Sequence, residues 1–354
     1  MEKNDPAKNT SQEILVEVCN KNKGVITLNR PRSLNALNLP MTTTILSTLK
    51  KWENEMDLVV VKSACDKAFC AGGDVFAMAA GGPSNPQYGI ENTNNAYTIV
   101  YTINKYKIPY ISLVDGIAMG GGVGLSHSGK YCIASEKSVF AMPETSIGFF
   151  PDVGTSYFFS RLGNLGLYLA LTGHKLHGKD AVKIGYASHF VESKNLSALI
   201  DDILKNEGND LENVIENYSE DISDHVLSLT PHLQLIDRVF SAQSVKEIME
   251  RLRSEGSEFS KVTLNQLNKM SPIALKTVKT QLEKASGMSM KECLQMDHRL
   301  AKAAFRAISS CDFYEGTTAL KQKRVPKWNP EKLEDVSDEM VEKLFLPTEE
   351  ELDL

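Results

Sequence analysis

The sequence lacks any apolar run close to the roughly 18 residues that a membrane span requires. It also lacks an excess of positive charge, because its 354 residues carry a net charge of −6. We therefore expect a soluble chain with no general attraction for nucleic acid or an anionic membrane surface. A negatively charged ligand would be bound by local basic side chains and backbone amides. The length of 354 residues predicts one large or two unequal domains, and the hydrophobic fraction of 42% favours a well-buried globular protein.

Cysteine pairs are missing too. None of the six cysteines forms a C-x-x-C pair or a recognisable metal-ligand spacing, which favours a reducing compartment and gives no indication of a metal site. Residues 1–12 contain no arginine but include Glu2 and Asp5, whereas transit peptides are rich in arginine and poor in acids. We therefore expect residues 1–12 to be a disordered N-terminus and no transit peptide to be part of this chain.

Several catalytic motifs are absent. No G-x-S-x-G elbow exists, and the adjacent Ser126 and His127 would point about 100° apart on a helix, which argues against a serine hydrolase. No His-Glu-x-x-His pattern accompanies His174, His177 and His189, which we interpret as turn or packing residues. The central glycine cluster lacks the spacing of a dinucleotide fingerprint and the Lys-Ser/Thr of a phosphate loop.

Two apolar segments that the sequence does contain each end in a glycine-rich turn. Residues 58–63 lead to the turn at 68–74, and residues 110–114 lead to the glycines at 120–124. Both patterns predict a buried strand that enters a tight backbone turn. After the second turn we expect a helix over 125–130, whose first N–H groups would attract negative charge.

Two acidic residues follow the second glycine turn. An apolar run at 138–142 stops just before Glu144, and Asp152 lies eight residues further on, between proline and glycine. We expect Gly121 to need the dihedral freedom of glycine and its N–H to stabilise an oxyanion, while the two carboxylates handle water and protons. Acyl transfer requires both parts, although a glycine turn or a loop glutamate taken singly is more often structural.

These turns belong to a longer series of motifs, T-L-N-R-P at 27–31, A-F-C-A-G-G-D at 68–74, M-G-G-G-V-G-L-S at 119–126, A-M-P-E-T at 141–145, G-F-F-P-D-V-G at 148–154 and C-D-F-Y-E-G at 311–316. In these motifs the chain resembles the crotonase, or enoyl-CoA hydratase/isomerase, superfamily, whose members bind acyl-CoA thioesters between two such turns. The resemblance covers nearly the whole chain and is greatest to the hydrolases of 3-hydroxyisobutyryl-CoA. It implies hydrolysis of that ester to 3-hydroxyisobutyrate and CoA, a step of valine catabolism.

The resemblance implies an α/β fold. A crotonase-like spiral of β-β-α turns would occupy residues 13–195, a helical C-terminal region 196–346, and an acidic tail 347–354. The apolar patterns agree, because they predict strands before residue 191 and helices after it. We expect the tail to be frayed and residues 80–95 to form a mobile loop that orders when ligand binds.

The resemblance also implies roles for individual residues. The N–H groups of Gly73 and Gly121 would form the oxyanion hole for the thioester carbonyl. Glu144 would act on water as a general base or attack the thioester as a nucleophile, and Asp152 would orient the substrate hydroxyl or the water. The residues expected along the substrate are Ala36, Ala71, Gly72, Asp74, Gly120, Gly121, Glu144 and Asp152. No cofactor is implied beyond the CoA of the substrate.

Two positions bear on the choice between activities. Gly124 stands where enoyl-CoA hydratases usually carry a second glutamate, which argues against hydration. Ala96, followed by Tyr97, stands where these hydrolases commonly carry a glutamate. The missing carboxylate keeps two alternatives open: a weakly active or non-catalytic paralogue with a structural role, for instance in a mitochondrial ribosome, and a hydratase or isomerase of the same fold.

The compartment and the assembly follow only from the resemblance. It implies a mitochondrial location, with the cytoplasm and the peroxisome as alternatives. The expected partner is an acyl-CoA thioester, with no direct contact to nucleic acid or membrane. The acyl group and the oligomeric state stay open, a homo-oligomer included.

Overall fold

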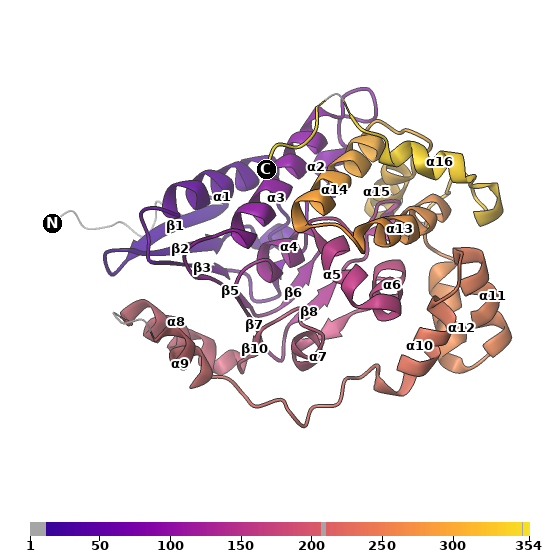
Figure 1. The fold of residues 1–354 in the computed structure, drawn as a ribbon. Helices are drawn as coiled ribbons and strands as arrows, with labels where there is room; N and C mark the ends of the chain where they lie inside the picture. The colour runs from indigo at the N-terminus through magenta and orange to yellow at the C-terminus, as the bar shows by residue number, and fades with distance from the viewer. Residues whose placement is uncertain (1–11, 207–209, 349) are drawn as a thin grey trace.

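The computed structural model describes residues 12–206, 210–348 and 350–354, and the prediction for residues 1–11 lies outside this part of the chain. The strands are β1 (Ile14–Cys19), β2 (Lys23–Leu28), β3 (Leu58–Ser63), β4 (Ala68–Cys70), β5 (Tyr110–Val114), β6 (Ile117–Met119), β7 (Tyr131–Ala134), β8 (Val139–Ala141), β9 (Leu176–His177) and β10 (His189–Phe190). Within the described ranges they form a six-stranded sheet, β1-β2-β3-β5-β7-β10, and a four-stranded sheet, β4-β6-β8-β9 (Figure 1).

From β3 to β8, consecutive strands alternate between the two sheets. β3, β5 and β7 lie in the six-stranded sheet, and the strands that follow them, β4, β6 and β8, lie side by side in the other. β4, β6 and β8 run parallel, so their carboxyl ends meet at one edge of the sheet. The chain therefore advances as a spiral, and each turn of the spiral delivers one loop to the same place.

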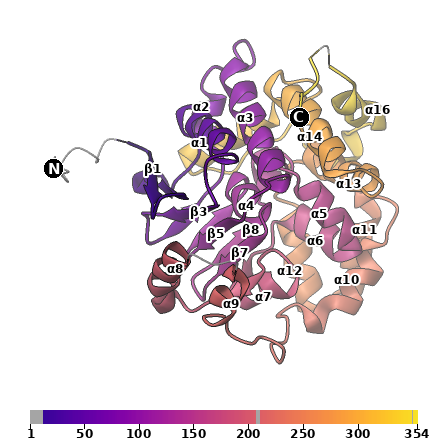
Figure 2. The same cartoon turned by 60° about the vertical axis from the view of Figure 1, so that its left-hand side comes forward.

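Helices cover both faces of the six-stranded sheet. Those of the spiral are α1 (Leu39–Trp52), α2 (Val75–Ala79), α3 (Gln87–Asn104), α4 (Gly121–His127), α5 (Thr155–Arg161), α6 (Gly163–Thr172) and α7 (Gly178–Lys183). The face opposite α1 is covered by α8 (Leu196–Lys205) and α9 (Leu211–Glu216), as Figures 1 and 2 both show. There Leu199, Ile203 and Ile215 pack on the buried Val60 and Ile111, which gives the sheet apolar layers on both sides.

The rest of the chain is helical. It consists of α10 (Leu233–Phe240), α11 (Val245–Glu255), α12 (Glu258–Leu267), α13 (Pro272–Ala285), α14 (Met290–Phe305), α15 (Asp312–Gln322) and α16 (Asp338–Glu342). Side chains next to the N-termini of α13 and α14 cap these helices. The Ser271 hydroxyl accepts from the N–H of Ala274 at the start of α13, and Ser289 and Glu292 form a capping box at the start of α14. α13 packs on α5 and α6, and α14 packs on α3, so these helices lie close to the spiral (Figure 2).

The predicted loop at 80–95 is wrong over more than half of its length, because α3 begins at Gln87. The asparagines that suggested a loop are fixed by tertiary hydrogen bonds. Asn92 donates to the carbonyl of Leu37, and Asn95 donates to Thr43 of α1. These bonds override the low helix propensity of asparagine.

The prediction of a frayed tail is also wrong for its described residues. Leu352 is buried, the Nε2 of His298 lies 3.0 Å from the carbonyl oxygen of Glu350, and Arg299 pairs with Glu351 at 2.8 Å. The acidic tail is held because basic groups of α14 lie beneath it.

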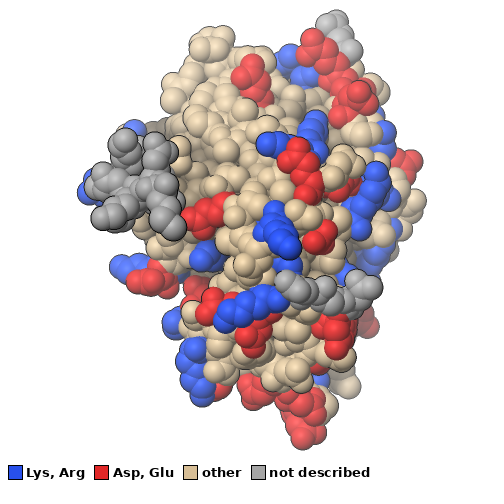
Figure 3. All heavy atoms as spheres, turned by 90° about the vertical axis from the view of Figure 1, so that its left-hand side faces the viewer, with Lys and Arg blue, Asp and Glu red and all other residues tan. Residues whose placement is uncertain are grey.

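Charge is mixed on the surface. On the face shown in Figure 3, Lys and Arg side chains are interspersed with Asp and Glu. None of the described helices is both long enough and apolar enough to cross a bilayer.

Candidate active site

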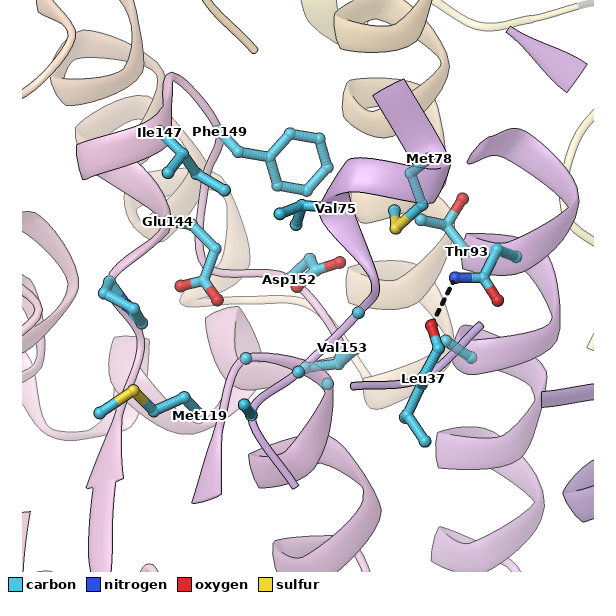
Figure 4. A pocket seen from close by; sticks show the side chains of 18 of the residues that line it. Leu37, Val75, Met78, Thr93, Met119, Glu144, Ile147, Phe149, Asp152 and Val153 are labelled. Carbon is cyan, nitrogen blue, oxygen red and sulfur yellow. Dashed lines mark hydrogen bonds between the residues drawn. The ribbon is translucent and has the colours of Figure 1, made fainter. Parts of the chain in front are cut away.

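A cavity of about 280 Å³ opens where the loops after β4, β6 and β8 meet. In Figure 4 Glu144 and Met78 of α2 lie on opposite sides of it, and Asp152 lies between them with Val75 close by. Its lining comprises Leu37, Thr42, Ala71, Gly72, Gly73, Val75, Met78, Asn92, Thr93, Ala96, Met119, Gly120, Gly121, Pro143, Glu144, Ser146, Ile147, Phe149, Asp152, Val153, Phe313 and Leu320. Most of these side chains are apolar, which is typical of a ligand pocket with a few placed polar groups.

The two glycine turns lie against each other at the floor of the cavity. An ideal Cβ on Gly121 would lie 3.5 Å from the nitrogen of Gly73. No backbone carbonyl in the described ranges accepts a hydrogen bond from either N–H. For Gly121 the reason is that it opens α4, where the first N–H groups have no partner within the helix. Both N–H groups remain available for an oxygen atom of a ligand.

The predicted start of the helix after the second turn is wrong. α4 begins at Gly121 rather than near residue 125. A Cβ on Gly122 would lie 2.2 Å from the carbonyl oxygen of Cys70, so the glycines allow this helix to start directly against β4. Close packing here outweighs the poor helix propensity of glycine.

Gly120, and not Gly121, is the residue that needs the freedom of glycine. Gly120 has φ of 49°, and a Cβ there would lie 2.7 Å from the Oε1 of Glu144. Gly121 has no positive φ, and a Cβ on it would make contacts of 3.5 Å or more. The expectation that Gly121 requires special dihedrals is therefore wrong.

The carboxyl group of Glu144 is buried at the start of a 3₁₀ turn, η3 (Glu144–Ile147). Its Oε2 has no hydrogen-bond partner among the described residues. Burial, and then the neighbouring Asp152, raise the pKa of Glu144 well above its usual range. A buried acid with an unused oxygen beside a cavity is a candidate for proton transfer.

Asp152 is buried as well, but it has a partner. The hydroxyl group of Tyr97, on α3, donates to its Oδ2 at 2.9 Å. Burial raises the pKa of Asp152 to about 7, although the Tyr97 hydrogen bond acts in the opposite direction. The two carboxyl groups thus differ in their hydrogen bonding, because Asp152 accepts from Tyr97 whereas the Oε2 of Glu144 has no partner among the described residues.

Most of the predicted site residues meet at the cavity. Ala71, Gly72, Gly73, Gly120, Gly121, Glu144 and Asp152 all line it. Ala36 and Asp74 do not. Asp74 caps α2 by accepting from the N–H of Ala77 and pairs with Arg30 at 2.7 Å, and Arg30 also donates to the Ala36 carbonyl. In this structure both residues stabilise the turn from behind.

The sequence analysis predicted no role for Tyr97, which contacts Asp152, or for the aromatic wall of the cavity. Tyr97 had no predicted role, although it stands beside Ala96, which does line the cavity. The aromatic wall of Phe149 and Phe313, with ring centroids 5.3 Å apart, joins a spiral loop to α15. Both phenylalanines lie in motifs of the resemblance, and this was the only signal for them.

Position 124 has no room for a glutamate. A Cβ on Gly124 would lie 2.6 Å from the Cβ of Val153 and 3.0 Å from Val100. A second acid could enter here only if the loop that carries Asp152 moved. The geometry therefore agrees with the argument against hydration.

One group of residues within the described ranges has the geometry of a metal site: His189, Glu212 and Glu216. None of them lines the cavity. Glu212 is already bound by Lys130 and Tyr131, at 3.2 and 2.6 Å.

Comparison with known proteins identifies the class. Residues 23–345 match the family model described as enoyl-CoA hydratase/isomerase, so the chain belongs to this family. The predicted crotonase-like α/β spiral, followed by a helical C-terminal region, is confirmed. A solved structure similar to this one, with a TM-score of 0.90 and 31% identity, is a carnitinyl-CoA dehydratase from Mycobacterium thermoresistibile; the match covers 97% of this chain and 98% of that one. An enoyl-CoA hydratase from Rhodobacter sphaeroides has a TM-score of 0.84 and 29% identity, covering 95% and 98%.

More similar sequences narrow the class. The chain is 45% identical over 333 residues to the mitochondrial 3-hydroxyisobutyryl-CoA hydrolase of Xenopus tropicalis, with 91% of this chain and 86% of that protein covered. It is 42% identical over 327 residues to the human mitochondrial protein of the same name, with 89% and 84% covered. The resemblance to these hydrolases is thereby confirmed over most of the chain.

Proposed function

We propose that this protein is an acyl-CoA thioester hydrolase that converts 3-hydroxyisobutyryl-CoA and water to 3-hydroxyisobutyrate and CoA. The observation that carries the proposal is the placement of Glu144 and Asp152 on a cavity whose floor presents the N–H groups of Gly73 and Gly121. Relatives at 42–45% identity that bear the name of this hydrolase support it.

The thioester carbonyl oxygen would bind the Gly73 and Gly121 N–H groups. In one route Glu144 takes a proton from water as the water oxygen adds to the carbonyl carbon. The C–S bond then breaks, and the proton passes to the CoA sulfur. In the other route Glu144 itself displaces the thiolate, and water hydrolyses the resulting anhydride. Both routes need negative charge to develop on the carbonyl oxygen, where the two N–H groups would stabilise it.

The remaining carboxylate would set the geometry. Asp152, ionised above about pH 7, would accept a hydrogen bond from the attacking water or from the 3-hydroxyl group of the substrate. Its Oδ2 is oriented by Tyr97, so the carboxylate is held before substrate arrives. Such preorganisation is what places a nucleophile within reach of the carbonyl carbon.

Hydration of a double bond is less well supported, although the similar solved structures are named hydratase and dehydratase. That reaction in this family commonly uses a second glutamate at position 124, where the structure has glycine packed against Val153. The structural-paralogue alternative is opposed by Glu144. A buried carboxyl group without a partner is costly, and a scaffold has no use for it.

We further propose a mitochondrial location, because the relatives compared above are named as mitochondrial proteins. Localisation of the tagged protein in cells, by microscopy and fractionation, would test this part separately from the activity.

The experiment that tests the activity is release of free thiol from a panel of acyl-CoA esters. We expect the fastest release from 3-hydroxyisobutyryl-CoA. Glu144→Gln should lower kcat by about 10²–10⁴-fold with CoA binding retained, because it removes a proton-transfer group and little volume. Glu258→Gln, a change at an exposed glutamate of α12, serves as the control. Hydration of an enoyl-CoA without thiol release would refute the proposal.

A further inference from the structure

The loop that carries Asp152 has two residues with positive φ, and one of them is not a glycine. Val153 has φ of 54° and Gly154 has φ of 75°. A β-branched residue such as valine rarely adopts positive φ, because its branched side chain crowds the backbone there. Such a conformation persists only where surrounding contacts enforce it, and it is concentrated at functional sites.

The contacts that enforce it come from the C-terminal helices. The Oδ2 of Asp297, on α14, accepts a hydrogen bond from the Gly154 N–H at 3.0 Å. Its Oδ1 accepts from the Nε2 of Gln281, on α13, at 2.9 Å and from the Ser156 hydroxyl at 3.3 Å. The same Gln281 nitrogen donates to the Pro151 carbonyl at 2.9 Å. Asp297 and Gln281 thus hold the backbone on both sides of Asp152.

These two residues act behind the cavity and not in it. Asp297 and Gln281 are each 0% exposed, and neither lines the cavity. Asp152 is therefore held from two directions: its side chain by Tyr97 of α3 and its backbone by α13 and α14. The partners of Asp297 lie 141 and 143 residues away in sequence within the spiral.

We propose that Asp297 is a positioning residue for the reaction: with Gln281 it holds residues 151–156 in the strained conformation that aims Asp152 at the substrate. This inference rests on the proposed function for its chemistry, and on hydrogen bonds and backbone geometry for the holding. It gives α13 and α14 an indirect part in the active site, through the backbone that carries Asp152.

Two opposed effects act on the pKa of Asp297. Burial, and then the neighbouring Asp152, raise the pKa of Asp297 to about 8. The ionisable groups that interact with it are Asp152, Tyr97 of α3 and Cys293 of α14. All three hydrogen bonds to Asp297 are accepted by its carboxyl oxygens. The three donors lower the pKa of Asp297 and so oppose the effect of burial, because they favour its ionised form.

Hydrogen exchange of the segment 151–156, followed by mass spectrometry, tests the holding without requiring activity. Asp297→Asn keeps the shape of the side chain but offers one acceptor oxygen, and Asp297→Leu removes both. We expect exchange in this segment to become at least about tenfold faster in the leucine variant and to change less in the asparagine variant, because local opening follows the hydrogen bonds lost. Gln281→Met, which leaves Asp297 in place, should loosen the same segment.

Kinetics on 3-hydroxyisobutyryl-CoA then tests the positioning. We expect kcat to fall by about 10²-fold in Asp297→Leu, since a misplacement of about 1 Å has an effect of this size. KM and the Kd for CoA should stay within about twofold, because uniform binding is untouched. The matched control is Asp180→Asn. Asp180 is a buried acid of α7 that accepts from the N–H of Ser228 and lies outside the cavity, so its loss should affect stability but not kcat.

The exchange and kinetic measurements together decide whether Asp297 is a positioning residue. Faster exchange with an unchanged kcat, unchanged exchange, or an equal loss of kcat in Asp180→Asn would overturn the positioning role. If Asp297→Leu does not fold, the isosteric asparagine variant and Gln281→Met decide by the same two measurements. A wild-type protein that releases no thiol would overturn the proposed function instead, because the exchange rates still show whether Asp297 holds the loop.

Discussion

The phenol of Tyr97 donates a hydrogen bond to the Oδ2 of Asp152 at 2.9 Å, and both side chains are buried. The two residues are 55 positions apart in the sequence and meet because α3 crosses the spiral loop that follows β8. A hydrogen bond of this kind favours the ionised carboxylate and lowers its pKa, against the effect of burial. Tyr97 therefore lowers the pH at which Asp152 becomes available as an acceptor.

Replacing Tyr97 by phenylalanine should shift the pH profile. The acid limb of kcat/KM is expected near pH 7, where Asp152 ionises. Without the donor the pKa of Asp152 rises further, so the acid limb should move to higher pH. The expected displacement is about one pH unit, which corresponds to a hydrogen bond of roughly 1.5 kcal/mol. Tyr106→Phe is the control, because Tyr106 bonds the Leu49 carbonyl and does not line the cavity. An acid limb that stays in place would separate Tyr97 from the chemistry.

Asp152→Asn should make the protein more stable in mild alkali. The pKa of Asp152 is raised from its ordinary 3.8 to about 7, so between these values the folded state holds a proton that the unfolded chain has lost. The free energy of unfolding therefore falls as the pH rises from about 4 to about 7. Above pH 7 the buried ionised group lowers the free energy of unfolding by up to about 4 kcal/mol. Thermal unfolding at pH 8 should show a higher Tm for the variant, with the difference vanishing toward pH 4. A constant difference at all pH values would contradict the assignment.

Gly120→Ala should damage the site more than Gly121→Ala. A Cβ on Gly120 would lie 2.7 Å from the Oε1 of Glu144, so the catalytic carboxyl group has to move. The alanine backbone would also have to adopt φ of 49°, which is unfavourable for a residue with a side chain. We expect a fall in kcat of about 10²-fold or more. At Gly121 the added methyl makes ordinary contacts, and the loss should be smaller. Steady-state kinetics and circular dichroism on both variants provide the comparison, and equal losses would show that Gly120 has no special role.

The sequence predicted the parts of the site that are encoded locally. A buried strand followed by glycines marks a loop at a sheet edge, and parallel strands bring such loops together. This explains why local patterns singled out Gly121, Glu144 and Asp152 as candidates, whereas the candidate Gly73 came from the resemblance. The start of α4 was misplaced because glycine has poor helix propensity, and nothing nearby in the sequence shows that Gly122 packs on β4.

The contacts that tune the site could not be predicted in this way. Asp297 lies more than 140 residues from its partners at Gly154 and Ser156, and its position follows from how α14 docks on the spiral. The one local sign was an acid at helical spacing from the buried Cys293, Leu300 and Ala301. A buried acid on an apolar helix face needs partners, but the sequence does not say which.

Ala96 is a position where the resemblance leads us to expect a glutamate. The structure places it in the lining of the cavity on α3, one helical turn after Thr93, which also lines the cavity. A glutamate here would face the same space as Asp152. If a glutamate here contacts the substrate hydroxyl or the attacking water, its absence removes one charge-assisted hydrogen bond, worth about 1.5–3 kcal/mol.

Ala96→Glu should therefore raise kcat/KM for 3-hydroxyisobutyryl-CoA by roughly 10- to 100-fold, the factor that corresponds to this free energy. The gain should be confined to esters with a 3-hydroxyl group, because an ester without one leaves the new carboxylate buried and unpaired. Ala96→Gln is the matched control, since it adds nearly the same volume without charge. The panel of esters used for the wild type serves here as well, with Tm measured for each variant to separate activity from unfolding. Equal gains for glutamine and glutamate would show that shape rather than charge matters at this position. A loss on every ester would show that the cavity is adapted to an acyl group without a hydroxyl, because a third acid beside Glu144 and Asp152 would then only raise the pKa values of its neighbours.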